Sequence, residues 1–540
     1  MSRISRVSRF LFLLVIFVTS SAFTAELPVI SAAMPWADSE GYSPVIISVS
    51  SFSERTLTIR AKVDSVEAQI AMIAGGGQAV RATLLLPPLQ TDGGHVEITW
   101  SSDDGLSGEL SVSATNAHRR LALAVIDSDE SIPLKNLEFA DATTFSTFST
   151  LSPSRYRSTS SGKTFSARIP RMDLPERWQG YPTWMTLIFA ANDDVALAAE
   201  QRAAIATWVV AGGTVVIATN AQREAWRKVG VEPWLLNSSE KALIQRLNRI
   251  GSGKENPNVL ISVPGTESVP ATGFMLLATL FAVIVGPLNL WWVRRRGVPA
   301  LFLLTTPALS LITCVVLLGT NIIIEGLSLR RVASQLTVLD QQHARAITWT
   351  RASYYGGFSV ARFEIDSDAK VRRFEPEQDT GYSYRGRIAS ESYAIDWRGG
   401  QQLSGEWIPA RRNRQLLYVT ARTERAQLQL IRKGNHWQVT NGLGTTLRRL
   451  RWRDGDNVVY SCGPLHSGET AELAVETDKT AIVMGDFDGA AEHAAAVSYE
   501  PWGFTAELEN SFAALPGPVS LDAVPLTSYV VGRLNPGNTP

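Results

Sequence analysis

Alternating apolar and polar residues dominate the chain from Pro44 to about Thr115. The runs are rich in β-branched side chains and are separated by glycine-containing turn signals, as in antiparallel sheets. They cover Val45–Phe52, Arg55–Val63, Ala79–Pro88 and His95–Trp100. The pattern predicts a β-sandwich over 26–116. Gly75–Gly77 is interpreted as a hairpin turn, because no Lys-Ser/Thr pair follows it as a phosphate-binding loop requires.

The hydrophobic pattern changes after this region to continuous apolar runs. Three such runs, Leu121–Asp127, Trp184–Ala190 and Thr214–Thr219, are typical of strands buried on both faces. A helical pattern over Ala196–Ala211 separates the last two and ends at Gly212-Gly213, where a left-handed cap is favoured. This order predicts a parallel α/β sheet within 117–255.

Two long runs without charge follow, Phe274–Val293 with 20 residues and Ala300–Ile324 with 25. Each is long enough, as a helix, to cross a bilayer core of roughly 30 Å. Arg294, Arg295 and Arg296 lie in the short connection between them. The pattern predicts a transmembrane helical hairpin over 274–324, with spans at 274–293 and 300–324. The alternative is a pair of buried core helices.

Charge predicts the orientation of this hairpin. A short loop with three arginines favours the cytoplasmic side. The N-terminus has Arg3, Arg6 and Arg9, then an apolar core and small residues at Ser20–Ala22. These features predict a signal peptide over 1–22. Together they predict a multi-pass protein of the bacterial inner (cytoplasmic) membrane, with both soluble halves periplasmic or extracytoplasmic and only Arg294–Pro299 in the cytoplasm.

Short strand-like runs return after Arg331 and continue to about Val531, with turn signals at Gly, Asn and Asp. They predict one large or two small β-sandwich modules over 330–534, followed by a disordered tail, 535–540. The predicted fold class is therefore a multidomain α/β and all-β membrane protein.

Composition narrows the function classes. Lys plus Arg and Asp plus Glu both total 51, so the neutral chain has no bulk electrostatic attraction to nucleic acid. Two cysteines, Cys314 and Cys462, exclude a disulfide framework and a cysteine-type metal site. The later histidines show no ligand spacing; they are His436, His466 and His493. We expect no cofactor.

The strings ERWQGYPTWMTLIFA and AEQRAAIATWVVAGGTVVIAT carry a resemblance to a known family. They resemble the class I glutamine-amidotransferase-like (flavodoxin-like α/β) domains of exported, membrane-anchored bacterial proteins, over about Leu121–Ile324. That family's nucleophile is a cysteine assisted by a histidine and an acid. No cysteine precedes Cys314, and His95 and His118 lie upstream of the α/β strands. The resemblance therefore implies the fold without the activity, and no catalytic residue is assigned.

Acidic residues follow two of the apolar runs: Asp127 and Asp129 after the first, Asp193 and Asp194 after the second. Ligands of open α/β sheets lie beyond the carboxyl ends of the strands. Several carboxylates there can bind Ca²⁺ or Mg²⁺. The alternative is that Asp193 and Asp194 cap the next helix and that the first pair lies in a solvated turn.

Arginines alternate with apolar residues in TTLRRLRWRDGD, placing Arg449, Arg451 and Arg453 on one strand face. Such a face can bind an anionic partner through bidentate contacts. The alternative is a solvated face with neighbouring carboxylates.

Two functions follow from these observations. The leading hypothesis is a non-catalytic, membrane-anchored envelope protein whose exported domains bind an envelope protein partner or act as a scaffold. The competing hypothesis is an enzyme acting on envelope polymer, or a cation-binding protein, that uses the strand-end acids. A transporter is disfavoured because the spans carry no intramembrane charge. The sequence leaves the oligomeric state open.

Overall fold

The computed structural model describes most of the chain. The described residues are 27–38, 41–89, 94–114, 120–129, 164–182, 185–235, 263, 271–297, 299–325, 329–374, 392–476, 494, 497–498, 500–518 and 522–534. The predicted signal peptide 1–22 and tail 535–540 lie outside them.

The N-terminal region forms a two-layered β structure that includes strands from far along the chain. One layer is a three-stranded sheet in the order β1-β2-β5, and the other has seven strands in the order β15-β18-β17-β4-β3-β6-β7. Their bounds are β1 Val29–Ala33, β2 Ser43–Ser50, β3 Arg55–Val63, β4 Val66–Ala74, β5 Ala79–Leu86, β6 Gly94–Ser102, β7 Ser107–Ala114, β15 Val360–Ile365, β17 Tyr393–Asp396 and β18 Gln401–Ile408. The parallel pairing of β17 with β4 joins segments that sequence analysis placed in separate domains.

A parallel sheet in the order β12-β11-β10-β8-β9 follows, and we call this sheet with its helices the α/β lobe. The strands are β8 Arg120–Ile126, β9 Thr164–Arg168, β10 Thr186–Phe189, β11 Thr214–Ile217 and β12 Trp234–Leu235; the helices are α2 Ala199–Val210 and α3 Asn220–Arg227, with 3-10 turns at Arg171–Asp173 and Trp178–Gly180. Gly212 has φ +110 after α2, and a Cβ on Gly213 would overlap the Trp208 ring. Both glycines are therefore needed by the turn between α2 and β11.

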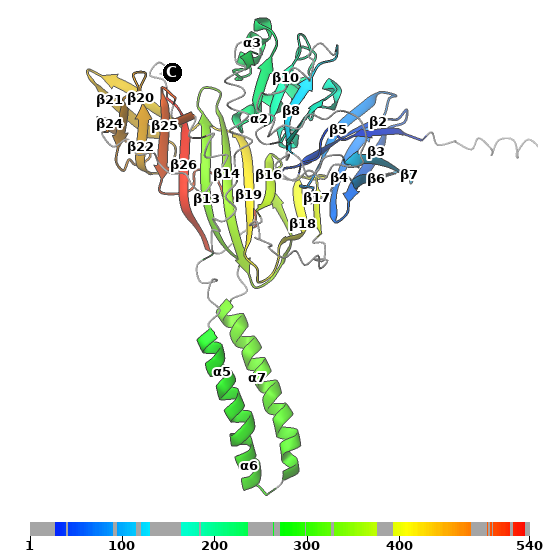
Figure 1. Cartoon of the computed structure of the whole chain (residues 1–540), viewed down its shortest axis with the longest axis vertical. Coiled ribbons are helices and arrows are strands. Elements are labelled where there is room, and N and C mark those ends of the chain that lie inside the picture. Colours follow the sequence, from blue (N-terminus) through cyan, green and yellow to red (C-terminus); the bar gives the residue numbers. More distant parts are fainter. Residues whose placement is uncertain are drawn as a thin grey trace, which may run out of the picture.

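An eleven-stranded sheet, the long sheet, connects the remaining parts in the order β16-β19-β14-β13-β26-β25-β22-β23-β24-β21-β20 (Figure 1). The bounds are β13 Leu329–Asp340, β14 Arg345–Gly356, β16 Ala369–Phe374, β19 Arg414–Thr423, β20 Gln427–Lys433, β21 His436–Gly442, β22 Leu447–Arg453, β23 Val459–Cys462, β24 Thr470–Val475, β25 Gly503–Leu508 and β26 Asp522–Arg533. β13 pairs antiparallel with β14 and parallel with β26. The long central strands β14, β13 and β26 therefore lie between β16 and β19 on one side and the shorter strands β20 to β25 on the other.

The two faces of the long sheet differ in chemistry. Paired residues of adjacent strands lie on the same face, so the strand register assigns each pair to one face or the other. The pairs Leu336–Trp349 and Val338–Ile347 are buried in one core with the α/β lobe. On the opposite face, the paired Thr337 and Thr348 hydroxyls are 2.9 Å apart.

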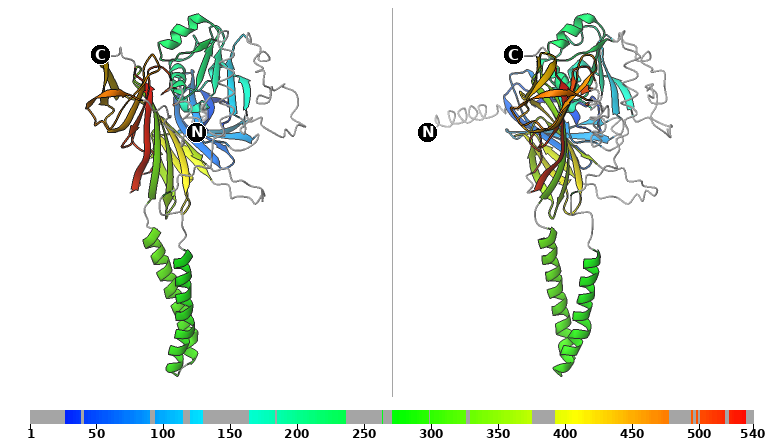
Figure 2. Two further views of the ribbon diagram at one scale, coloured as in Figure 1. Left: turned by 60° about the vertical axis from the view of Figure 1, so that its left-hand side comes forward. Right: turned by 90° about the vertical axis from the view of Figure 1, so that its left-hand side faces the viewer.

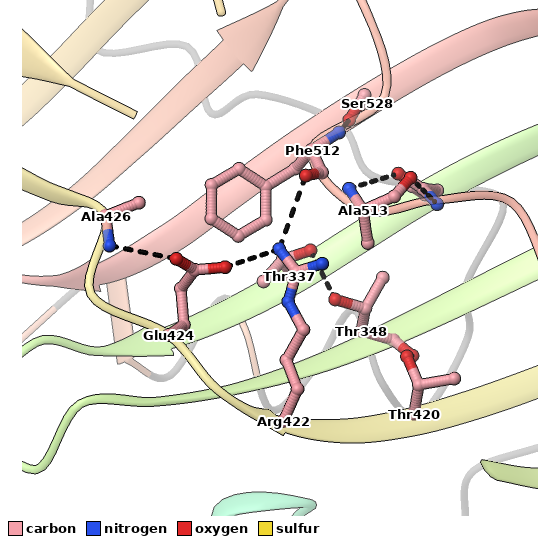
Figure 3. Close-up of polar contacts among 10 residues, drawn as sticks. Thr337, Thr348, Thr420, Arg422, Glu424, Ala426, Phe512, Ala513 and Ser528 are labelled. Carbon is pink, nitrogen blue, oxygen red and sulfur yellow. Dashed lines mark hydrogen bonds and ion pairs between the residues drawn. The ribbon is translucent and has the colours of Figure 1, made fainter. Parts of the chain in front are cut away.

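The segment 510–517 crosses this polar face and is held by its main chain. Gln335 donates to Ala513 O at 3.0 Å and accepts from Ala513 N at 3.2 Å. Arg422 donates to Phe512 O and forms an ion pair with Glu424 (Figure 3). These contacts satisfy polar groups that would otherwise be costly to bury.

A helical hairpin projects away from the β structure (Figures 1 and 2). It consists of α5 Ala271–Val283, a π-helical turn Ile284–Leu288, α6 Asn289–Arg295, a 3-10 turn Pro299–Leu301 and α7 Phe302–Glu325. Asn289 donates to the Thr306 hydroxyl at 3.2 Å and links α6 to α7. Many aliphatic side chains are exposed, Leu303 at 80% and Leu304 at 72%. Arg295 and Arg296 lie over the rings of Trp291 and Trp292.

The prediction of a transmembrane hairpin is corrected by these helices. Pro287 lies in the π-helical turn, which falls within the first charge-free run and separates α5, of 13 residues, from α6, of 7 residues. Among the residues described, no helix combines the length and apolar character that a membrane crossing requires. By this criterion the predicted spans 274–293 and 300–324 are wrong, and so is the fold class that included them. The predicted inner-membrane location, extracytoplasmic halves, membrane partner and role of Arg294, Arg295 and Arg296 in topology lose their basis with the spans.

Candidate functional site

The acidic residues predicted at the strand ends do lie together, but they contact neighbours within the α/β lobe. Asp193 follows β10 and is 7% exposed. Its carboxylate accepts from the backbone N–H of Ser128 at 3.0 Å and from the Ser128 hydroxyl at 2.5 Å. It therefore ties the turn after β10 to the turn after β8.

Asp194 is fully buried and connects this turn to α3. Its Oδ1 accepts from Gln222 at 2.6 Å, and its backbone carbonyl accepts from Arg202 at 2.6 Å. Gln222 also donates to Ala190 O at 2.9 Å. Asn192 has φ +73, a left-handed conformation that asparagine tolerates. The second oxygen, Asp194 Oδ2, has no hydrogen-bond partner among the described residues.

The other two predicted acids differ from each other. The Asp127 side chain is buried and lies 3.4 Å from the Arg168 guanidinium. Asp129 is exposed. In the part of the chain that the structure describes, no three His, Cys, Asp or Glu side chains are arranged to hold a metal ion.

The predicted arginine face lies on β22, with Leu450 and Trp452 buried on the other side. Arg449 and Arg451 both form ion pairs with Glu476, whose side chain is 7% exposed. Arg453 belongs to the same face of β22. One carboxylate thus neutralises part of the positive charge that an anionic partner would need.

Cys462 on β23 borders a cavity of about 520 Å³ beside Arg448 and Arg449. Burial raises the pKa of its thiol to about 11. We expect iodoacetamide to label Cys462 at pH 8 at least tenfold more slowly than an exposed cysteine, because only about one thiol in a thousand is then ionised. Mass spectrometry of the Cys314→Ser variant measures this rate. Asn435→Cys, in a background without Cys314 and Cys462, provides the exposed control; equal rates would contradict the prediction.

A cavity of about 730 Å³ lies between the α/β lobe and the end of the long sheet where β13 turns into β14. We call it the interlobe cavity. Its wall is aliphatic: Val209 and Val210 come from α2, Val231 from the turn after α3, and Val338 and Leu339 from β13. The volume falls within the range of roughly 300–1,000 Å³ that is usual for small-molecule sites.

Polar groups surround the rim of the interlobe cavity. Glu232 accepts from Arg227 at 2.7 Å and from Arg223 at 2.9 Å, and these contacts lower the pKa of its carboxyl. His343 Nδ1 lies 2.8 Å from Asp340. Gly230 has φ +77, and a Cβ there would meet the His343 ring. The histidine is therefore fixed by its acid and by close packing.

Sequence analysis missed this cavity because its wall comes from separate parts of the chain. The local signals for a site were weak. They are a turn with a charged residue at each end, Asp340–Arg345, and a glycine before a valine, Gly230. Neither signal shows that α2 packs against β13. That packing is seen only in the hydrophobic core to which both α2 and β13 contribute residues.

Comparisons with known proteins do not identify the chain. No protein-family model matches it, and no curated protein matches it. A similar solved chain is the yeast delta-COP-I mu-homology domain complexed with the Dsl1 WxWxV peptide, at 7% identity and TM-score 0.18, covering 39% of this chain and 97% of that chain. This likeness is too low to support a fold or a function. The predicted resemblance to exported amidotransferase-like proteins is wrong: it rested on local strings, and the chain is predominantly β with no helix fit to cross a membrane among the described residues.

Proposed function

We propose that the chain is a non-catalytic binding or scaffold protein whose partner contacts the interlobe cavity. The observation that carries this proposal is the use of the strand-end carboxylates for internal contacts. Asp193 binds Ser128, Asp194 binds Gln222 and Asp127 pairs with Arg168. Carboxylates engaged in this way stabilise the turns of the α/β lobe, and they are poorly placed to act on a substrate.

The arrangement of the cores supports the same proposal. The α/β lobe and the long sheet share one hydrophobic core, and the interlobe cavity opens beside it. A partner in the cavity would therefore contact both parts of the protein at once. Recognition at such a junction needs positioned polar groups around an apolar wall, and the rim and wall described above provide both.

Site-specific photo-crosslinking in the source cells tests this proposal. A photoreactive residue replaces the exposed Gln342 on the rim, and Val209→Trp fills the cavity in a second variant. We expect a discrete adduct at Gln342 that is lost with Val209→Trp, and none from a photoreactive residue at Asn435, in the turn between β20 and β21. No adduct, or an adduct unaffected by filling the cavity, would refute the proposed binding surface.

The structural role of Asp193 gives a prediction of its own. Asp193→Ala is expected to lower the free energy of unfolding by about 2–3 kcal/mol, because two hydrogen bonds to a buried carboxylate are lost. Asp129→Ala is the matched control, since Asp129 is exposed, and is expected to change stability by less than about 0.5 kcal/mol. Urea unfolding followed by circular dichroism measures both. If Asp129→Ala instead abolished the protein's function in cells at unchanged stability, that result would support an enzyme.

A second function, cation binding or catalysis by the acidic strand ends, is favoured by one observation. Asp194 Oδ2 is buried without a hydrogen-bond partner in the described part of the chain. A hard cation such as Ca²⁺ or Mg²⁺ would satisfy this oxygen. Calorimetric titration of the purified chain with each cation, and of the Asp194→Asn variant, tests it; binding that is lost in the variant would support this second function.

A further inference from the structure

The edge strand β7 is open to a further strand, and we infer that it binds an extended peptide segment in which apolar and basic residues alternate. β7 ends the seven-stranded sheet and, among the described residues, pairs only with β6 (Figure 1). An unpaired sheet edge presents a row of main-chain donors and acceptors to which a peptide can add as a strand. This surface shares no residue with the interlobe cavity, so the inference goes beyond the proposed function.

Two other edge strands carry features that hinder such pairing, and β7 does not. β20 ends in Arg432 and Lys433, and the Gln341 side chain accepts from the Leu428 N–H of this strand at 2.8 Å. β15 has a shift of register after Val360. Charged residues and irregularities of this kind are the usual protection of a sheet edge. β7 has eight residues in uninterrupted register with β6 and contains no proline, lysine or arginine.

The hydrogen bonds at the β6–β7 turn show which main-chain groups of β7 face outward. Ser102 N donates to Leu106 O at 2.8 Å, whereas Asp103 N donates to Thr56 O, on the β3 side, at 3.1 Å. Bonded and non-bonded pairs alternate along an antiparallel ladder, so the even-numbered residues of β7 bond to β6. The N–H and C=O groups of the odd-numbered residues face outward; these residues are Ser107, Glu109, Ser111 and Ser113.

The side chains of β7 define what an added strand must carry. Leu110 and Val112 are half-buried and pack against the core of the sandwich. Apolar side chains of an added strand would cover them further on this inner face. On the outer face, Glu109 is exposed, lies opposite Thr99 and has no ion-pair partner in the described part of the chain. A lysine or arginine beside Glu109 would pair with its carboxylate, so alternating apolar and basic residues fit both faces.

Fluorescence anisotropy of a labelled peptide mixed with the full chain tests the inference. The probe alternates valine with threonine and carries one central lysine in place of a threonine; a second probe has glutamate at that position. We expect saturable binding of the lysine probe. Ser111→Pro should weaken this binding at least tenfold, because the outward N–H is lost while the bonds from β7 to β6 remain. Ser111→Thr keeps the N–H group and is the matched control, expected to bind as the original chain does.

Charge reversal provides a variant that does not depend on proline. Glu109→Lys should weaken binding of the lysine probe at least fivefold at low ionic strength, and it should strengthen binding of the glutamate probe. A change in the probe itself tests the main-chain pairing. Methylation of every second amide nitrogen should abolish binding in one frame and leave it unchanged in the other, because only alternate amides of an added strand face the edge.

Several results would overturn the inference. They are no saturable binding of the lysine probe, equal affinity of Ser111→Pro and Ser111→Thr, and the same effect of methylation in both frames. A concentration-dependent dimer in sedimentation that is lost in Ser111→Pro would assign the edge to a second copy of this chain, and would overturn it as well. None of these variants changes a residue of the interlobe cavity, so the crosslinking result at Gln342 is unaffected and the two proposals fail independently.

Discussion

Trp208→Ala is expected to lower the free energy of unfolding by about 3–5 kcal/mol, the usual cost of removing a buried tryptophan. Trp208 is 2% exposed, and its ring lies 5.4 Å from that of Tyr181. Its Nε1 donates to Pro182 O at 2.9 Å. The residue holds α2 against the turn before β10, and α2 carries Val209 and Val210 into the interlobe cavity. Chemical denaturation followed by tryptophan fluorescence and circular dichroism measures the loss.

Trp208→Phe is the matched control for this prediction. It keeps a ring against Tyr181 and removes the hydrogen bond and part of the volume, so we expect a smaller loss of about 1–2 kcal/mol. Crosslinking at Gln342 should decrease in Trp208→Ala even at temperatures where the protein remains folded. A loss below about 1 kcal/mol for Trp208→Ala would show that α2 is held mainly by other contacts.

Local pattern placed many individual elements near their observed positions. The helix expected at Ala196–Ala211 compares with α2 at Ala199–Val210, and the run Thr214–Thr219 contains β11. The same local features misled the family inference. Gly212 is required by its positive φ and Gly213 by the close Trp208 ring, so this string reflects a packing requirement that any helix-to-strand unit can share. A short string of this kind therefore indicates the local geometry of a helix-to-strand turn and does not indicate common ancestry with a family.

Long-range pairing could not be predicted from the sequence. β17 joins β4, and β13 pairs in parallel with β26, although each partner lies far away in the chain. The hairpin shows a related limit: the sequence places Pro287 within the charge-free run, but it does not show that a π-helical turn forms there. The acidic strand ends are different: the alternation of apolar runs with a helix predicted a parallel sheet, and Asp193 meets Ser128 because β10 and β8 are parallel neighbours.

Gly517→Ala is expected to lower the free energy of unfolding by about 2–4 kcal/mol, because it combines backbone strain with overpacking. Gly517 has φ +93, and a Cβ there would overlap the hydroxyls of Tyr354 and Tyr418. These hydroxyls lie 3.1 Å apart, and Tyr354 also donates to Pro516 O at 3.1 Å. Neither ring can move easily because both side chains are buried. Urea unfolding measures the loss, and hydrogen exchange should show faster exchange at Ala513.

Gly468→Ala is the control that separates strain from overpacking. Gly468 has φ +81, but a Cβ there would have no atom within 4 Å, so only the conformational cost of about 1–2 kcal/mol is expected. The difference between the two variants then measures how tightly 510–517 is packed on the long sheet. If Gly517→Ala costs no more than Gly468→Ala, the segment can lift from the tyrosines, and its main-chain contacts with Gln335 and Arg422 would contribute little to holding it in place.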